Sequence, residues 1–142
     1  MPTPIRILVI EDDVMVAFAV VAILQEEGWI IVGPIAKLKP AIEASAEAEF
    51  DCALVDANLG GEFADGVAVN LQRRGKPFVL ATGHNREDLS EELRRAPMLR
   101  KPFRTSDLLD AVRRMIAERA PRRTSCGPTA KAKPPLRRLL CR

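Results

Sequence analysis

At four places in this sequence, a short apolar run is followed directly by charged or hydroxyl side chains. Glu11-Asp12-Asp13 follows the first run, Asp56 the third, Thr82 the fourth and Arg100-Lys101-Pro102 the fifth. If the runs are parallel strands of one sheet, the turns after them meet at the edge formed by the carboxyl ends. Carboxylates gathered at one edge repel each other unless a cation joins them, and a cluster of oxygen ligands suits Mg2+.

The chemistry that such a set can perform is the transfer of a phosphoryl group to a carboxylate. Asp56 would be the nucleophile and would need no general base, because its carboxyl group is ionised at neutral pH. The Lys101 ammonium and the Thr82 hydroxyl would share the charge on the phosphoryl oxygens with the metal ion. Each residue alone is common in a loop, and Asp13 is expected to cap the next helix. The prediction therefore depends on their joint placement.

The elements that must position these residues alternate along the chain. Short apolar runs at residues 5–10, 30–34, 51–55, 78–81 and 98–99 are typical of strands buried on both faces. Helical patterns lie at residues 14–27, 41–48, 66–74, 86–96 and 106–119. Five strands alternating with five helices predict an α/β fold, a doubly wound five-stranded parallel sheet flanked by helices.

Residues 1–120 and 121–142 differ in composition, which predicts one domain followed by a basic, proline-rich tail. The tail carries seven positive side chains and no acidic one, so removing its charge from the net +3 leaves −4 for residues 1–120. We expect the tail to be disordered. A contact with nucleic acid or a membrane is the less favoured interpretation, because the tail has no aromatic residue and no amphipathic length.

Several features of the sequence favour a cytoplasmic protein. Its longest apolar runs are shorter than the ~20 residues of a membrane span, and the N-terminus leads into a strand-like run without a signal-peptide pattern. The cysteines lack a metal-like spacing, and Cys52 lies in an apolar run, as expected of a core residue in a reducing compartment.

Four segments, ILVIEDDVMV, ALVDANLGG, FVLATG and LRKPF, resemble in this order the strand-end motifs of response-regulator receiver domains of two-component systems, which have the CheY-like fold. The resemblance covers about residues 4–120. It implies that Asp56 is the phosphoacceptor, that Lys101 pairs with the phosphoryl group and that Thr82 donates a hydrogen bond to it. It also implies that the peptide bond between Lys101 and Pro102 is cis.

The same resemblance implies a set of metal ligands. Mg2+ would be held by Asp12, Asp56 and the backbone carbonyl of Asn58, and Glu11 would contribute through bound water.

Two positions depart from the common receiver pattern. Met98 stands three residues before Lys101, where the family usually has an aromatic residue that moves on activation, and the chain has no tyrosine. Asn58-Leu59-Gly60-Gly61 replaces a loop that usually ends in proline. PFVLATGH, DANLGGE and APMLRKPF resemble the FAT GUY receivers, which are largely single-domain regulators linked to sensor kinases of the HWE/HisKA2 type.

His84 is the only histidine of the chain and stands two residues after Thr82. It is either a surface loop residue or a side chain that shields or orients the water that hydrolyses the phosphorylated Asp56. The second interpretation predicts that His84→Ala changes the dephosphorylation rate more than the yield of phosphorylation.

The sequence therefore predicts a phosphoacceptor and not an enzyme. It would accept a phosphoryl group from a sensor histidine kinase or a phosphorelay protein. It would then contact a downstream protein through the face of the fourth helix, fifth strand and fifth helix, which is the output face in the family. A haloacid dehalogenase-like phosphatase would place D-x-D after its first strand, where this chain has Glu11-Asp12-Asp13. A flavodoxin-like cofactor binder would need a glycine-rich phosphate loop there. A scaffold that is never phosphorylated is the third alternative.

Overall fold

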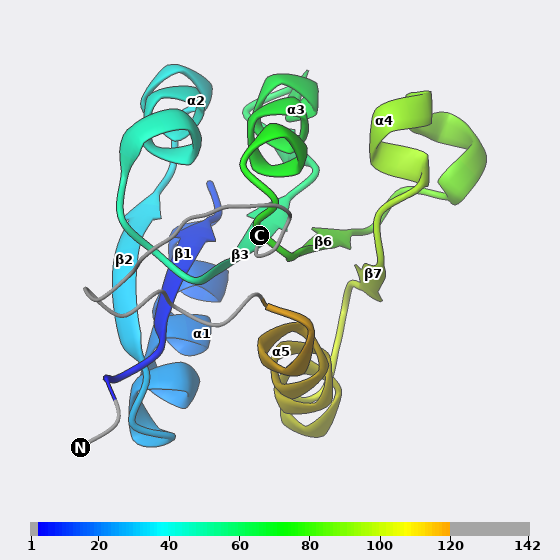
Figure 1. Ribbon diagram of the computed structural model, residues 1–142. Helices are drawn as coiled ribbons and strands as arrows, with labels where there is room; N and C mark the ends of the chain where they lie inside the picture. The colour runs from blue at the N-terminus through cyan, green and yellow to red at the C-terminus, as the bar shows by residue number, and fades with distance from the viewer. Residues whose placement is uncertain (1–2, 120–142) are drawn as a thin grey trace.

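The computed structural model describes residues 3–119, which form a parallel sheet with helices on both faces (Figure 1). The order in the sheet is β2-β1-β3-β6-β7, and every neighbouring pair is parallel. These five strands are β1 (Arg6–Ile10), β2 (Ile30–Ile35), β3 (Cys52–Asp56), β6 (Phe78–Thr82) and β7 (Met98–Arg100). The predicted doubly wound α/β fold is confirmed.

Two helices cover one face of the sheet and three cover the other (Figure 1). The first pair is α1 (Val14–Glu26) and α5 (Thr105–Glu118), and the other three are α2 (Leu38–Glu47), α3 (Asp65–Arg73) and α4 (Glu91–Arg94). Successive strand residues point to opposite faces, so Ile7 and Val9 pack with α1 and α5 while Leu8 and Ile10 pack with α2 and α3. Because both faces are covered, β3 and β6 are buried along their whole length, which explains their continuous apolar sequences.

The helix predicted at residues 86–96 is wrong in its extent. A single 3-10 turn spans Arg86–Asp88, the chain is extended at Leu89 and Ser90, and only Glu91–Arg94 is α-helical. The Ser90 hydroxyl accepts a hydrogen bond from Leu93 N at 3.3 Å, so Ser90 caps α4. Leu89 and Leu93 both lie in the core. A serine followed by two glutamates is the sequence pattern that would have predicted this start.

Helix α1 is apolar on all sides, although only one side faces the sheet. Ala17, Val20 and Leu24 are buried, whereas Met15 and Phe18 are 78% and 79% exposed. A helix that is hydrophobic all round is usually buried on all sides, so this exposed face is unusual for a surface helix.

An irregularity in β2 fixes the end of β1. Gly33 has φ +106, and a Cβ atom on it would approach Val9 O to 2.8 Å, so only glycine fits at this point. The pairing register of β1 and β2 shifts here, and beyond the shift Glu11 N donates to Ile35 O at 2.9 Å. The backbone of Glu11 is thereby held at the edge of the sheet.

Residues 1–2 and 120–142 lie outside the described residues, so the predicted basic tail at 121–142 stays a prediction. Within residues 3–119 no helix is long and apolar enough to span a membrane. Cys52 is a fully buried core residue, as predicted.

Candidate functional site at the carboxyl edge of the sheet

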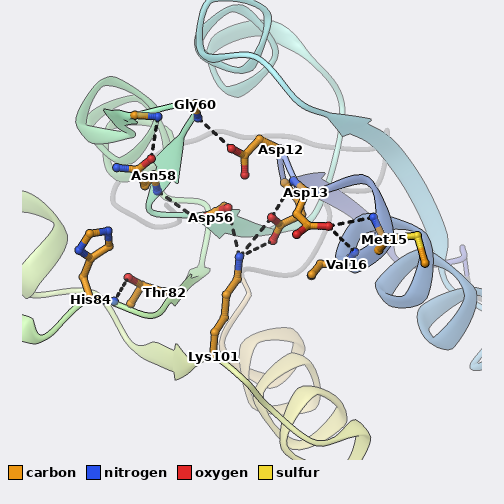
Figure 2. A network of polar contacts seen from close by, with 12 residues as sticks. Asp12, Asp13, Met15, Val16, Asp56, Asn58, Gly60, Thr82, His84 and Lys101 are labelled. Carbon is orange, nitrogen blue, oxygen red and sulfur yellow. Dashed lines mark hydrogen bonds and ion pairs between the residues drawn. The ribbon is translucent and has the colours of Figure 1, made fainter.

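The ends of four strands bring the predicted polar residues together (Figure 2). Glu11 and Asp12 follow β1, Asp56 ends β3, Thr82 ends β6 and Lys101 follows β7. One carboxylate oxygen each from Glu11, Asp12 and Asp56 lie within 4.8 Å of one another. Glu11 and Asp56 are 5% and 6% exposed, which means that these acids are clustered inside a pocket and not on an open surface.

The ammonium group of Lys101 balances part of this negative charge. Its Nζ lies 2.9 Å from Glu11 Oε1 and 3.2 Å from Asp56 Oδ2. Lys101 N donates to Thr82 O at 2.9 Å, which extends the pairing of β7 with β6 and fixes the start of the loop. The peptide bond from Lys101 to Pro102 is cis, as the family resemblance implied.

Burial and neighbouring acids make the ionisation of Asp56 unfavourable. Desolvation is the largest cause that raises its pKa, and the side chains of Glu11 and Asp12 raise it further, to about 7. A hydrogen bond at 3.0 Å from Asn58 N to Asp56 Oδ1 acts in the opposite direction, because it stabilises the carboxylate. Without another cation, Asp56 therefore keeps its proton up to about neutral pH, so the prediction that its carboxyl group is ionised there holds only when a cation joins the cluster.

Asp12 and Lys101 have pKa values that favour their charged forms. Burial alone would raise the pKa of Asp12, but hydrogen bonds dominate, above all the one from Gly60 N to Asp12 Oδ2 at 2.8 Å, and the pKa is lowered. Burial alone would lower the pKa of Lys101, but the carboxylates of Glu11 and Asp56 outweigh it, and the pKa is raised.

The donor set fits a hard divalent cation. The Lys101 ammonium pairs with Glu11 and Asp56 but not with Asp12, so the cluster has negative charge that a small dication would neutralise. Their oxygens lie within 4.8 Å, while opposite ligands of Mg2+ at about 2.1 Å would be about 4 Å apart. All three ligands are oxygens, the type that Mg2+ prefers.

The hydroxyl of Thr82 is buried at the inner side of the pocket, with 1% of the residue exposed. Thr82 Oγ1 accepts a hydrogen bond from His84 N at 2.9 Å. Because that bond uses an oxygen lone pair, the hydroxyl hydrogen can be donated to a group bound beside Asp56. Figure 2 shows His84 directly after Thr82, with its imidazole pointing toward the turn that carries Asn58.

A small hairpin beside the pocket was not predicted. Strands β4 (Asn58–Leu59) and β5 (Glu62–Phe63) pair antiparallel around Gly60 and Gly61, whose φ values are +61 and +93. Two glycines between two short strands are typical of a tight hairpin turn, so the Gly60-Gly61 pair was the available signal. Gly61 N also donates to Asn58 Oδ1 at 2.9 Å. The hairpin holds Asn58 next to Asp56.

Met98 was also predicted as a site residue, but it takes no part in this polar network. It lies on β7, pairs with Leu80 and packs half-buried against the core beside α4.

The chain belongs to the response regulator receiver domain family, whose sequence model matches residues 7–113. A receiver domain is a signalling module and not an enzyme, and receiver domains act with histidine kinases. The family sites bind Mg2+ in an acidic pocket such as the one formed by Glu11, Asp12 and Asp56.

Among known proteins, the chain is 30% identical over 113 residues to the transcriptional regulatory protein PdtaR of Mycobacterium tuberculosis. That similarity covers 77% of this chain and 55% of PdtaR, so the chain spans about half the length of this relative. The solution structure of SdrG from Sphingomonas melonis Fr1 is 30% identical, with a TM-score of 0.69, and the match covers 82% of this chain and 99% of SdrG. The receiver domain of the sensor histidine kinase PA1611 from Pseudomonas aeruginosa PAO1 is 19% identical, with a TM-score of 0.71, over 81% of this chain and 99% of that one. It holds a magnesium ion in its active site cleft.

Proposed function

We propose that this chain is a response regulator that accepts a phosphoryl group on Asp56 and thereby switches its contacts with other proteins. The observation that carries the proposal is the buried cluster of Glu11, Asp12 and Asp56 around the Lys101 ammonium, at the edge where parallel sheets place their sites. The Lys101 ammonium would neutralise part of the charge of a phosphoryl group that arrives at Asp56, and a metal ion held by the acids would neutralise more of it.

The transfer needs one nucleophile and groups that accept developing charge. An oxygen of the Asp56 carboxylate attacks the phosphorus of a phosphohistidine, an O–P bond forms and the N–P bond breaks. The imidazole leaves with the electron pair of the N–P bond and takes a proton from solvent. The hydrogen bond from Asn58 N to Asp56 Oδ1 limits rotation of the carboxylate. The attacking oxygen therefore stays oriented toward the phosphorus.

Lys101 and Thr82 have complementary roles in this transfer. The Lys101 ammonium exchanges part of its contact with Asp56 for the arriving phosphoryl oxygens, and the Thr82 hydroxyl donates to another of them. Mg2+, held by Asp12, Asp56 and the carbonyl of Asn58 with Glu11 acting through water, would supply the remaining charge neutralisation. The magnesium ion in the PA1611 receiver, which has the same fold, supports this assignment.

The phosphodonor is proposed to be a sensor histidine kinase of the HWE/HisKA2 type that docks on α1. The exposed apolar side chains Met15 and Phe18 lie in the first turns of α1, just after the acidic residues of the pocket. An apolar hollow of about 540 Å³ lies between α1 and the segment Lys101–Phe103. A helical partner seated there would have its histidine close to Asp56. The output contact is proposed for the face of α4, β7 and α5.

The same proposal has two further parts. We infer that the chain belongs to the FAT GUY subgroup and that its folded part is residues 1–120. The match to SdrG extends over 99% of that protein, which fits a regulator whose folded part is a receiver. The basic segment 121–142 is proposed to be an extension without a role in phosphotransfer.

The experiment is a phosphotransfer profile against the histidine kinases of the source cell, with Asp56→Asn as the control. We expect rapid label transfer from one or a few kinases to the wild type and none to the variant. Absence of transfer from every kinase, or equal labelling of Asp56→Asn, would leave a scaffold that is not phosphorylated as the better account.

A further inference from the structure

The rings of Phe63 and His84 contact each other although they belong to different loops. Their centroids are 5.4 Å apart and the ring planes are inclined by 64°, an edge-to-face arrangement. Phe63 ends β5 and is 39% exposed. His84 follows β6 by two residues. A phenylalanine so near the surface gains little from the core, so its ring contact with His84 is its most specific interaction.

The backbone of His84 is fixed by the pocket and by β7. Its N–H donates to Thr82 Oγ1 at 2.9 Å, and its carbonyl accepts from Arg100 Nη1 at 3.4 Å. Arg100 Nη2 also donates to Asn85 Oδ1 at 2.8 Å, which holds the next residue of the loop. Within residues 3–119 the imidazole itself takes part in no hydrogen bond, so the Phe63 ring is the contact that sets its direction.

Phe63 is in turn fixed by the hairpin, which is tied to the acidic cluster. Phe63 pairs with Asn58, and Asn58 N donates to Asp56 Oδ1 at 3.0 Å. At the turn of the hairpin, Gly60 N donates to Asp12 Oδ2 at 2.8 Å. The ring pair therefore links the residue that bonds to Thr82 with the hairpin that carries Asn58 beside Asp56.

We propose that Phe63 is a positioning residue that holds the imidazole of His84 beside Asp56, so that the two rings together limit the access of water from that side. This inference rests on the proposed phosphorylation of Asp56. In the hydrolysis that the rings retard, a water oxygen attacks phosphorus, the bond from phosphorus to the Asp56 oxygen breaks, and the aspartate carboxylate and dihydrogen phosphate result. The rings act on this reaction and not on the transfer from the kinase, because the donor itself expels water from the mouth as it binds.

The test is a double-mutant cycle on the half-life of phosphorylated Asp56. The wild type, Phe63→Ala, His84→Ala and the double variant are phosphorylated by a small-molecule acyl phosphate with Mg2+, the donor is removed, and loss of phosphate is followed. We expect each single variant to shorten the half-life by about 2- to 10-fold, the range that corresponds to an aromatic pair. The double variant is expected to show no further loss.

Two substitutions at position 63 separate positioning from general packing. Phe63→Tyr keeps the ring edge and is expected to retain the wild-type half-life, whereas Phe63→Leu keeps apolar bulk without a ring and is expected to behave like Phe63→Ala. Glu62→Ala, an exposed neighbour on the same hairpin, is the matched control and is expected to leave the half-life unchanged.

The inference would be overturned if the half-life of the double variant were shortened by the product of the two single-variant fold-changes. A wild-type half-life in Phe63→Leu would overturn it as well. Both results would leave the proposed function standing, because the wild type would still be labelled on Asp56. If the wild type took no label from a histidine kinase or from the small-molecule acyl phosphate, the proposed function would be overturned and this inference with it.

Discussion

Replacing Asp56 by asparagine is expected to stabilise the fold at neutral and alkaline pH while abolishing phosphorylation. Asp56 is 6% exposed and lies beside Glu11 and Asp12, and these surroundings raise its pKa from the ordinary 3.8 to about 7. Folding therefore forces a carboxylate into a place that disfavours its charge. Asparagine keeps the size and the hydrogen-bond acceptor and removes the charge.

The magnitude follows from the linkage between protonation and folding. Between pH of about 4 and about 7 the folded chain holds a proton that the unfolded chain releases, so the free energy of unfolding falls as pH rises through this window. The full rise in pKa sets a ceiling of about 4 kcal/mol on the loss. Asp56→Asn also removes one partner of Lys101, which keeps its pair with Glu11 at 2.9 Å. We therefore expect a gain of about 2 kcal/mol at pH 8, which is about 5–10 °C in Tm.

The assay is thermal and urea unfolding at pH 5 and pH 8 in a chelator, so that no metal offsets the charge. The difference between Asp56→Asn and the wild type should be about two to three times as large at pH 8 as at pH 5. Asp110→Asn, the same change of charge at an exposed position of α5, should give a difference near zero at both pH values. A variant less stable than the wild type at pH 8, or a gain that does not depend on pH, would refute this account of the pocket.

Four further outcomes follow from the same structure. Lys101→Met should slow labelling of Asp56 by a small-molecule acyl phosphate by at least about tenfold, measured as the initial rate, because the ammonium that neutralises the phosphoryl oxygens is lost. Asp12→Asn should weaken Mg2+ binding by at least about tenfold in calorimetric titration, since it removes one ligand charge; equal affinity would exclude Asp12 as a ligand. Phe18→Ser should reduce transfer from the cognate kinase but leave labelling by the small molecule unchanged, because Phe18 lies on the exposed face of α1. Deletion of residues 121–142 should leave labelling and Tm unchanged, and loss of folding would mean that this segment packs on the domain.

The sequence was sufficient to predict the sheet and the residues at its carboxyl edge. Strands buried on both faces have short, continuous apolar runs, and β3 and β6 are of this kind. The edge residues could be predicted because a parallel sheet places all its strand ends together, whatever the details of packing. Asp13 was also predicted correctly as a helix cap, and it accepts from Met15 N and Val16 N at 2.9 and 3.1 Å.

The parts that could not be predicted depend on contacts between distant segments. The break in the fourth helix lies at Leu89 and Ser90, whose backbone is extended, and a continuous helical pattern over residues 86–96 does not reveal it. The contact of Phe63 with His84 requires the position of one loop relative to another, and no spacing in the sequence encodes that distance. The raised pKa of Asp56 likewise depends on how deeply the strand end is buried.

Locating the phosphoryl group within the chain shows directly whether Asp56 is the phosphoacceptor. The wild type would be incubated with a small-molecule acyl phosphate and Mg2+, digested under mild acid, and its peptides examined by mass spectrometry. We expect a single added phosphoryl group on Asp56, labile to hydroxylamine as an acyl phosphate, and we expect no labelling when Mg2+ is chelated beforehand. A stable phosphoryl group on another residue, or an unmodified chain under conditions in which a known receiver is labelled, would contradict this expectation.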